Sequence, residues 1–132
     1  MNQDYNFVSV RAAAVLTTGY VAATVIGPDN MNPALRNQIT LLIDYTTGSG
    51  TSLDVKVEYA HDGSTPDYYQ ETFESISTGT ATMSLGVYNF AATGKYTLSI
   101  PVKAAYVKVS VKGNGVDQTG SSCKIGAIVG TV

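Results

Sequence analysis

The chain has 132 residues, a length that suits one domain. Only 14% of the residues are charged and the formal net charge is −2, which argues against general nucleic-acid binding. The hydrophobic fraction of 44%, with many Gly, Ser, Thr, Val and Tyr residues, is typical of compact β proteins. The single cysteine, Cys123, excludes an internal disulfide and is expected to be a buried apolar side chain.

The first 36 residues have no clear period. The segment from Arg11 to Ile26 is rich in Ala, Val and Thr, and it lacks the 3.6-residue repeat of a helix. We therefore expect residues 1–36 to form an N-terminal arm or short strands, and residues 37–132 to form the main domain. The start of the chain lacks the features of a signal peptide, and no apolar run reaches the roughly 18 residues of a membrane span. These observations predict a protein made in a cytoplasm, with no membrane partner.

Two segments alternate strictly between apolar and polar residues, which predicts half-buried strands. Leu53 to Tyr59 (LDVKVEY) places its apolar side chains on one face and Asp54, Lys56 and Glu58 on the other. Val107 to Lys112 repeats the pattern, with three valines facing the core.

Gln38 to Thr46 is a further strand, and Leu42 on its second face predicts a strand covered on both sides. Weaker patterns predict four more strands. Gly86 is a possible bulge in the strand that begins at Thr80, and Pro101 ends the strand that begins at Lys95 or places it at an edge of the sheet. The four strands span Tyr68–Phe73, Thr80–Phe90, Lys95–Val102 and Lys124–Val132. Gly-rich turns separate these segments, so we expect an all-β antiparallel sandwich or barrel.

The charges are unevenly distributed along the chain. Residues 1–90 carry three basic and nine acidic residues (3 − 9 = −6), whereas residues 91–132 carry five lysines and one aspartate (5 − 1 = +4). Opposite charges can pair across neighbouring strands of one sheet. They can also form complementary patches by which copies dock on each other or on a larger assembly.

The densest polar stretch, Glu58 to Phe73 (EYAHDGSTPDYYQETF), contains the only histidine, His61. A zinc site needs several His or Cys ligands, and the segment that begins at Asp62 does not fit a calcium-binding loop. A serine triad lacks its nucleophile motif, and candidate carboxylates such as Glu58, Glu71 and Glu74 form no recognisable pair. We expect no catalytic, cofactor or metal site and interpret the stretch as a hairpin loop with its flanking strand ends.

Tyr68 and Tyr69 are adjacent, so one of them must point outward if they lie in a strand. An outward tyrosine could stack on a sugar, but tyrosine is also enriched at protein interfaces.

The segment Val55–Phe73 (VKVEYAHDGSTPDYYQETF) resembles the strand–loop–strand of small structural proteins encoded near the capsid genes of tailed bacteriophages. Three later segments are similar to the same proteins in order and texture, so the resemblance spans about residues 38–132. They are Ile76–Phe90, Gly94–Gly115 and Gly120–Val132.

The resemblance implies a head decoration (cement) protein with a β-sandwich or jelly-roll fold. Such a protein commonly trimerises, binds the major capsid protein on the capsid surface of the virion and stabilises the mature shell. Alternatives are a tail, neck or baseplate component, or a sugar-binding module on the virion. We expect contacts to capsid or sister subunits at the N-terminal segment and one loop, since arms and loops carry binding on rigid β scaffolds. The candidate residues are Tyr5, Phe7, Val8, Arg11, Tyr68 and Tyr69.

Overall fold

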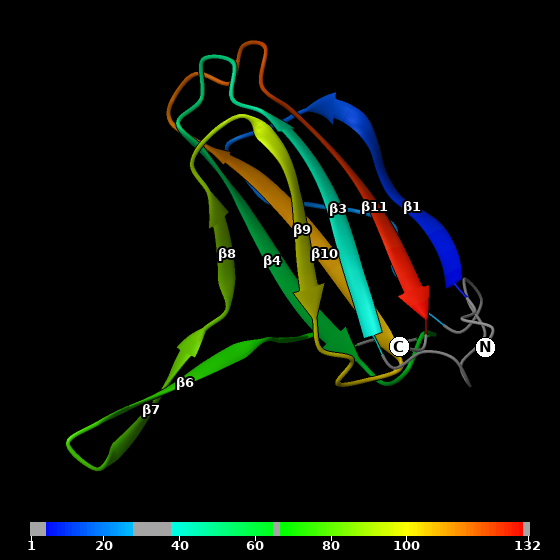
Figure 1. Ribbon diagram of the computed structural model, residues 1–132, viewed down its shortest axis with the longest axis vertical. Coiled ribbons are helices and arrows are strands. Elements are labelled where there is room, and N and C mark those ends of the chain that lie inside the picture. Colours follow the sequence, from blue (N-terminus) through cyan, green and yellow to red (C-terminus); the bar gives the residue numbers. More distant parts are fainter. Residues whose placement is uncertain (1–4, 28–37, 65–66, 131–132) are drawn as a thin grey trace.

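The computed structural model describes residues 5–27, 38–64 and 67–130. It is an all-β protein in which two antiparallel sheets pack face to face (Figure 1), and its described residues contain no helix. The predicted antiparallel β-sandwich is therefore confirmed. The strands are β1 Tyr5–Val15, β2 Val21–Ala22, β3 Gln38–Thr46, β4 Ser52–Ala60, β5 Tyr69–Gln70, β6 Thr72–Ser77, β7 Thr80–Leu85, β8 Val87–Phe90, β9 Gly94–Ile100, β10 Tyr106–Asn114 and β11 Ser122–Gly130.

One sheet, called sheet A here, has the order β1-β11-β3-β9. The other, sheet B, has the order β2-β10-β4-β5, and β8 also pairs with β4. The strands β6 and β7 pair only with each other and extend away from both sheets (Figure 1). A two-stranded hairpin is marginal in water by itself, so it depends on its attachment to the sandwich.

The two strongest sequence patterns lie at the centre of sheet B. β4 and β10 pair in register from Ser52↔Asn114 to Ala60↔Tyr106, which brings their apolar faces together. The core between the sheets is continuous and mostly β-branched, as period-two alternation predicts. Its largest fully buried side chains are Tyr45, Ile26, Ile39, Leu41, Ile43, Leu53, Ile125, Val10, Val55, Val57, Val107 and Val109.

The polar face of sheet B shows the expected pairing of opposite charges. Glu58 on β4 lies 3.6 Å from Lys56 and 3.6 Å from Lys108 on β10. Tyr20 adds an unexpected cover, because its ring centroid lies 4.4 Å from Lys56 Nζ and 5.0 Å from Lys112 Nζ. Ser110 lies between Lys108 and Lys112 on β10 and pairs with β2. It is buried, although the alternation of β10 predicts that it faces water.

The described part of the first 36 residues is built into the sandwich. β1 pairs with β11 from Tyr5↔Gly130 to Val15↔Ser122, and β2 joins the edge of sheet B. Residues 1–4 and 28–36 lie outside the described residues. The sequence predicts either an N-terminal arm or short strands for residues 1–36, and residues 5–15 and 21–22 form strands.

The remaining strand boundaries follow the turn and proline signals. β9 ends at Ile100, immediately before Pro101, and it is the edge strand of sheet A, as predicted. The predicted strand Thr80–Phe90 is divided at Gly86 into β7 and β8, which belong to different sheets. The predicted hairpin around His61 is also confirmed, because β4 pairs with β5 through Glu58↔Gln70 and Tyr59↔Tyr69.

Candidate functional site

The base of the projecting hairpin is held by Glu71, the residue between β5 and β6. Its backbone nitrogen donates to the carbonyl of Val57 on β4 at 2.9 Å, and its own carbonyl accepts from Gly86 at 2.6 Å. The segments that enter and leave the hairpin are thus joined at one residue. A side chain at Gly86 would be crowded, since a Cβ there would lie 3.0 Å from the carbonyl oxygen of Glu71.

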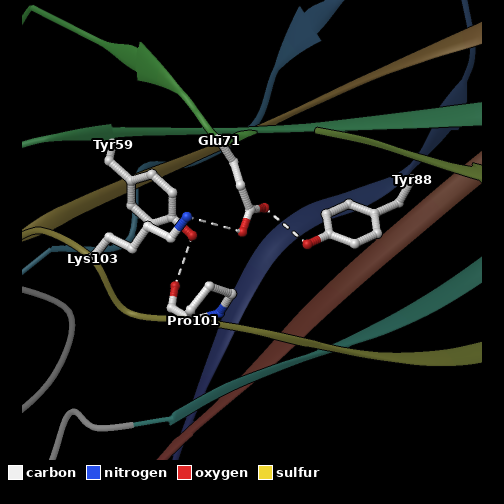
Figure 2. Close-up of polar contacts among 5 residues, drawn as sticks. All are labelled: Tyr59, Glu71, Tyr88, Pro101 and Lys103. Atoms are coloured by element: carbon white, nitrogen blue, oxygen red, sulfur yellow. Dashed lines mark hydrogen bonds and ion pairs between the residues drawn. The ribbon is translucent and has the colours of Figure 1, made fainter. Parts of the chain in front are cut away.

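The Glu71 carboxylate is buried with only 3% of the residue exposed, and two groups satisfy it (Figure 2). The Tyr88 hydroxyl on β8 donates to Oε2 at 2.8 Å, and Lys103 Nζ lies 3.8 Å from Oε1. Tyr59 lies beside them and donates to the carbonyl of Pro101 at 2.7 Å. Buried charges persist in folded proteins when they are paired and hydrogen-bonded in this way.

The electrostatics of this cluster keep both tyrosines in the donor form. Burial first, and then the neighbouring Glu71 carboxylate, raise the pKa of Tyr59 well above its ordinary value. Burial also raises the pKa of Tyr88, and the hydrogen bond to Glu71 adds to the effect. The protonated phenol of Tyr88 thus holds the Glu71 carboxylate at the base of the hairpin, while that of Tyr59 holds the segment at Pro101 beside it.

The hairpin has two chemically different faces. The cross-strand pairs Thr72↔Leu85, Glu74↔Met83 and Ile76↔Ala81 share one face, because directly opposed residues point to the same side. This apolar face is exposed over Ile76 (72%), Leu85 and Met83. The opposite face carries hydroxyl side chains and Phe73, whose ring lies edge-on to Tyr88 at 5.3 Å between centroids.

A second apolar surface lies on the outer face of sheet A. It is a shallow hollow of about 370 Å³, called the outer hollow here, whose lining includes Phe7, Leu42, Lys95, Lys124 and Gly126. Phe7 is 66% exposed and its ring lies over Gly126, where a Cβ would come within 2.6 Å of it. Leu42 is 36% exposed, so the cover that the sequence predicts for both faces of β3 is incomplete within the described chain.

The predicted contact residues in the N-terminal segment differ in their surroundings. Val8 is only 8% exposed and faces the core, because it alternates with Phe7 along β1. The guanidinium of Arg11 donates to the carbonyls of Cys123, Ala14 and Val15, across an irregular part of the β1–β11 pairing. Val8 and Arg11 are therefore occupied within the chain, and Phe7 is the side chain presented outward. The side chain of Tyr5 lies outside the described residues.

The two adjacent tyrosines also separate. Tyr68 is half-buried, and its ring centroid lies 4.1 Å from Lys108 Nζ. Tyr69 is 71% exposed and lines a pocket of about 380 Å³ together with His61, Asp62 and Asp67. His61 is exposed at this pocket. Tyr68 therefore points outward with Lys108, as the sequence predicts for one of the two, whereas Tyr69 pairs with the core-facing Tyr59 and is exposed because β5 is the edge strand of sheet B.

Among residues 5–27, 38–64 and 67–130, no group of three or more His, Cys, Asp or Glu side chains is arranged to hold a metal ion. The described strands and loops also include no helix with the length and apolar character to cross a membrane. The sequence does not reveal the anchoring role of Glu71. It also does not reveal that Met83 and Leu85 are exposed, because a strand with a buried apolar face and a strand with an exposed one have the same period-two spacing.

The fold and these surfaces define an all-β sandwich with a projecting amphipathic hairpin and an apolar hollow on one outer face. Comparison of the chain with models of known protein families gave no match, and comparison with curated proteins gave none either.

Proposed function

We propose that this chain is a structural protein of a bacteriophage virion that binds the outer surface of the capsid and stabilises the mature shell as a decoration or cement protein. In this proposal it acts without catalysis, its partner is the major capsid protein, and it binds as a homo-oligomer, for which a trimer is the expected form.

The observation that carries the proposal is the exposed apolar face of the hairpin. A soluble monomer gains nothing from holding Ile76, Met83 and Leu85 in water on a two-stranded ribbon, whereas an assembly protein buries such a face against a neighbour. The rigid Glu71 anchor supports the same function, because a fixed projection is ready to bind without a large loss of entropy. The capsid as the place of assembly comes from the resemblance of Val55–Phe73 and the later segments to phage structural proteins.

The proposed mechanism is mass action. A protein that binds the mature lattice and not its open form stabilises the mature lattice. The stabilising free energy grows with the logarithm of one plus the ratio of the free protein concentration to the dissociation constant. Contacts to the shell are assigned in this proposal to the end of the sandwich that presents Tyr69, which is exposed beside the His61 loop.

The test is co-sedimentation of the purified protein with capsids stripped of decoration. The wild-type protein should pellet with mature capsids at micromolar concentration and raise the temperature at which they disassemble. Tyr69→Ser should weaken binding, and Val116→Ser, which changes another exposed apolar side chain in the loop between β10 and β11, serves as the matched control. No co-sedimentation of the wild-type protein would contradict the proposal. Deleting residues 1–12 is a poor test, because it would remove Val8 and Val10 from the core.

A sugar-binding module on the virion is a second candidate, favoured by the pocket beside Tyr69. An exposed aromatic ring near the carboxylates of Asp62 and Asp67 offers a stacking surface and hydrogen-bond acceptors, as ligand pockets require. Binding on a glycan array that Tyr69→Ala abolishes would support this function, and an array without signal would exclude it for the sugars tested.

A further inference from the structure

We infer that the apolar face of the hairpin docks in the outer hollow of a second copy of this chain, and that repetition of this contact closes the copies into a ring. The inference deepens the oligomer included in the proposed function and rests on that part of it. It assigns a residue-level interface to both sides of the contact.

The first argument is that both surfaces lack a cover within the described chain. On the hairpin, Ile76, Met83 and Leu85 share one exposed face. On sheet A, Phe7 and Leu42 are exposed around the backbone of Gly126. Matching two exposed apolar surfaces removes both from water, and the free energy gained scales with the apolar area buried.

The second argument is charge complementarity. Glu74 is the only charged residue of the hairpin from Thr72 to Leu85, and it lies in the middle of the apolar face, opposite Met83. The outer hollow contains Lys95, Lys124 and Asp44, which sum to 2 − 1 = +1. Asp44 is the cross-strand neighbour of both lysines, so one lysine is left to meet Glu74. Within the described chain no ion pair within 4.0 Å involves Glu74, Lys95 or Lys124.

The third argument is geometric and requires a second molecule. The hairpin extends away from both sheets (Figure 1), whereas the hollow lies on the outer face of sheet A over β1, β11, β3 and β9. The Glu71 anchor fixes this direction through both segments at the hairpin base. The hairpin of one copy therefore meets the hollow of another copy.

A contact between two different surfaces is heterologous, and such contacts form a closed ring when the rotation between copies closes. It would also pair one acid of the acidic part of the sequence, Glu74, with a lysine of the basic part, Lys95 or Lys124.

The test measures the mass of the free, full-length protein by light scattering during size-exclusion chromatography. The wild-type protein should elute as a closed oligomer with a mass that is a small multiple of 13.8 kDa. Ile76→Glu places a charge on the apolar face and should weaken association at least about tenfold, since an unpaired charge is costly in an interface core. Ser75→Glu adds the same charge one residue earlier on the hydroxyl face and should leave the mass unchanged.

A charge exchange tests the hollow. Glu74→Lys should weaken association by a similar factor, and the double variant Glu74→Lys with Lys124→Glu should recover it. Because the side chains of Ile76, Ser75 and Glu74 are exposed in the monomer, all variants should keep the wild-type thermal transition at low concentration, where monomers dominate.

A disulfide trap distinguishes a ring from a chain of indefinite length. Phe7→Cys combined with Met83→Cys should give intermolecular crosslinks that stop at one fixed number of copies on a non-reducing gel. A monomeric wild-type protein at high micromolar concentration, or an Ile76→Glu variant with wild-type mass, would overturn the inference. If the protein pellets with capsids as a monomer, capsid binding stands, and the oligomer and this inference both fail. If it forms the ring and binds no capsid, the inference stands and capsid binding fails.

Discussion

The Tyr88 hydroxyl donates a 2.8 Å hydrogen bond to the carboxylate of Glu71, and this bond ties β8 to the point where the chain leaves sheet B for the hairpin. Tyr88 itself pairs with Val55 at the centre of β4, so the contact connects the hairpin base to the most regular part of the sandwich. The direction of the hairpin is therefore set by a charged hydrogen bond inside the fold.

Replacing Tyr88 by Phe should lower the free energy of unfolding by roughly 1.5–3 kcal/mol, the range for a hydrogen bond to a charged group. The ring and its contact with Phe73 remain in this variant, so the loss reports the hydroxyl. Urea denaturation followed by tyrosine fluorescence measures it.

The matched control is Tyr96→Phe. The Tyr96 hydroxyl donates to the carbonyl of Ala92 in an exposed position, so its removal should cost no more than about 1 kcal/mol. Equal losses in the two variants would show that the Glu71 carboxylate is no stronger an acceptor than an exposed carbonyl.

The architecture of the sandwich could be predicted because its central strands carry an unambiguous period of two. In β4, Leu53, Val55, Val57 and Tyr59 face the core as the alternation predicts, and β10 supplies the matching valines. Pro101 marks the end of β9 because proline cannot donate to the ladder of a sheet.

The projecting hairpin could not be predicted from the same signal. Met83 and Leu85 alternate with polar residues in the manner of a core strand, and periodicity does not state which surface covers an apolar face. Gly86 was expected to form a bulge, whereas the chain leaves one sheet there and enters another. The close approach of the Glu71 carbonyl to Gly86 depends on a pairing across the fold that local sequence does not contain.

The anchoring role of Glu71 was also hidden, since a carboxylate near a loop usually remains in water. Its burial depends on Tyr88 and Lys103, which lie 17 and 32 positions further along the chain (88 − 71 and 103 − 71). Phe7 was a candidate contact because it lies in the N-terminal segment, and Tyr69 because one of two adjacent tyrosines in a strand must point outward. Both side chains are exposed.

The buried hydroxyl of Tyr45 predicts an unusual result. Tyr45 is fully buried and, among the described residues, its hydroxyl has no hydrogen-bond partner. An unsatisfied buried hydroxyl carries a desolvation penalty, so Tyr45→Phe should leave the free energy of unfolding unchanged or raise it by about 1 kcal/mol.

Tyr59→Phe is the control for this prediction, because the Tyr59 hydroxyl does have an acceptor, the carbonyl of Pro101 at 2.7 Å. That variant should be destabilised by about 1 kcal/mol. Chemical denaturation of the two variants in parallel gives the comparison, and a Tyr45→Phe variant less stable than Tyr59→Phe would contradict it.

The tip of the hairpin contains a strained residue whose replacement should stabilise it. Thr78 has φ +52° and Gly79 has φ +78°, the backbone of a two-residue turn in which both positions are left-handed. A β-branched residue is disfavoured there by about 1–2 kcal/mol, and asparagine is preferred. Thr78→Asn should therefore slow hydrogen exchange of the β6 and β7 amides. Ser77→Asn, at an ordinary strand position, should not, and faster exchange in Thr78→Asn would refute the assignment of strain.

The thiol of Cys123 predicts how stability depends on alkaline pH. Burial raises the pKa of this thiol from 9.0 to about 11, while nearby Arg11 lowers it and Asp44 adds to the increase. Below pH 9 the thiol is protonated in both the folded and the unfolded chain, and its contribution to stability is complete. Between pH 9 and about 11 only the unfolded chain loses the proton, so the free energy of unfolding falls, by about 2 kcal/mol over the window.

Urea denaturation at several values from pH 8 to pH 11 measures this fall. Cys123→Ala is less stable overall because it leaves a cavity, but its stability should decline less steeply over the same range, which separates the thiol from the tyrosines that titrate there. Thiol-reactive reagents give an independent measurement. A neutral, fully buried thiol is protected from iodoacetamide at about pH 8. Unfolding should therefore limit the rate at which Cys123 is alkylated. Rapid alkylation of the folded chain, or identical pH slopes for wild type and Cys123→Ala, would show that the thiol is ionised or accessible in the native state.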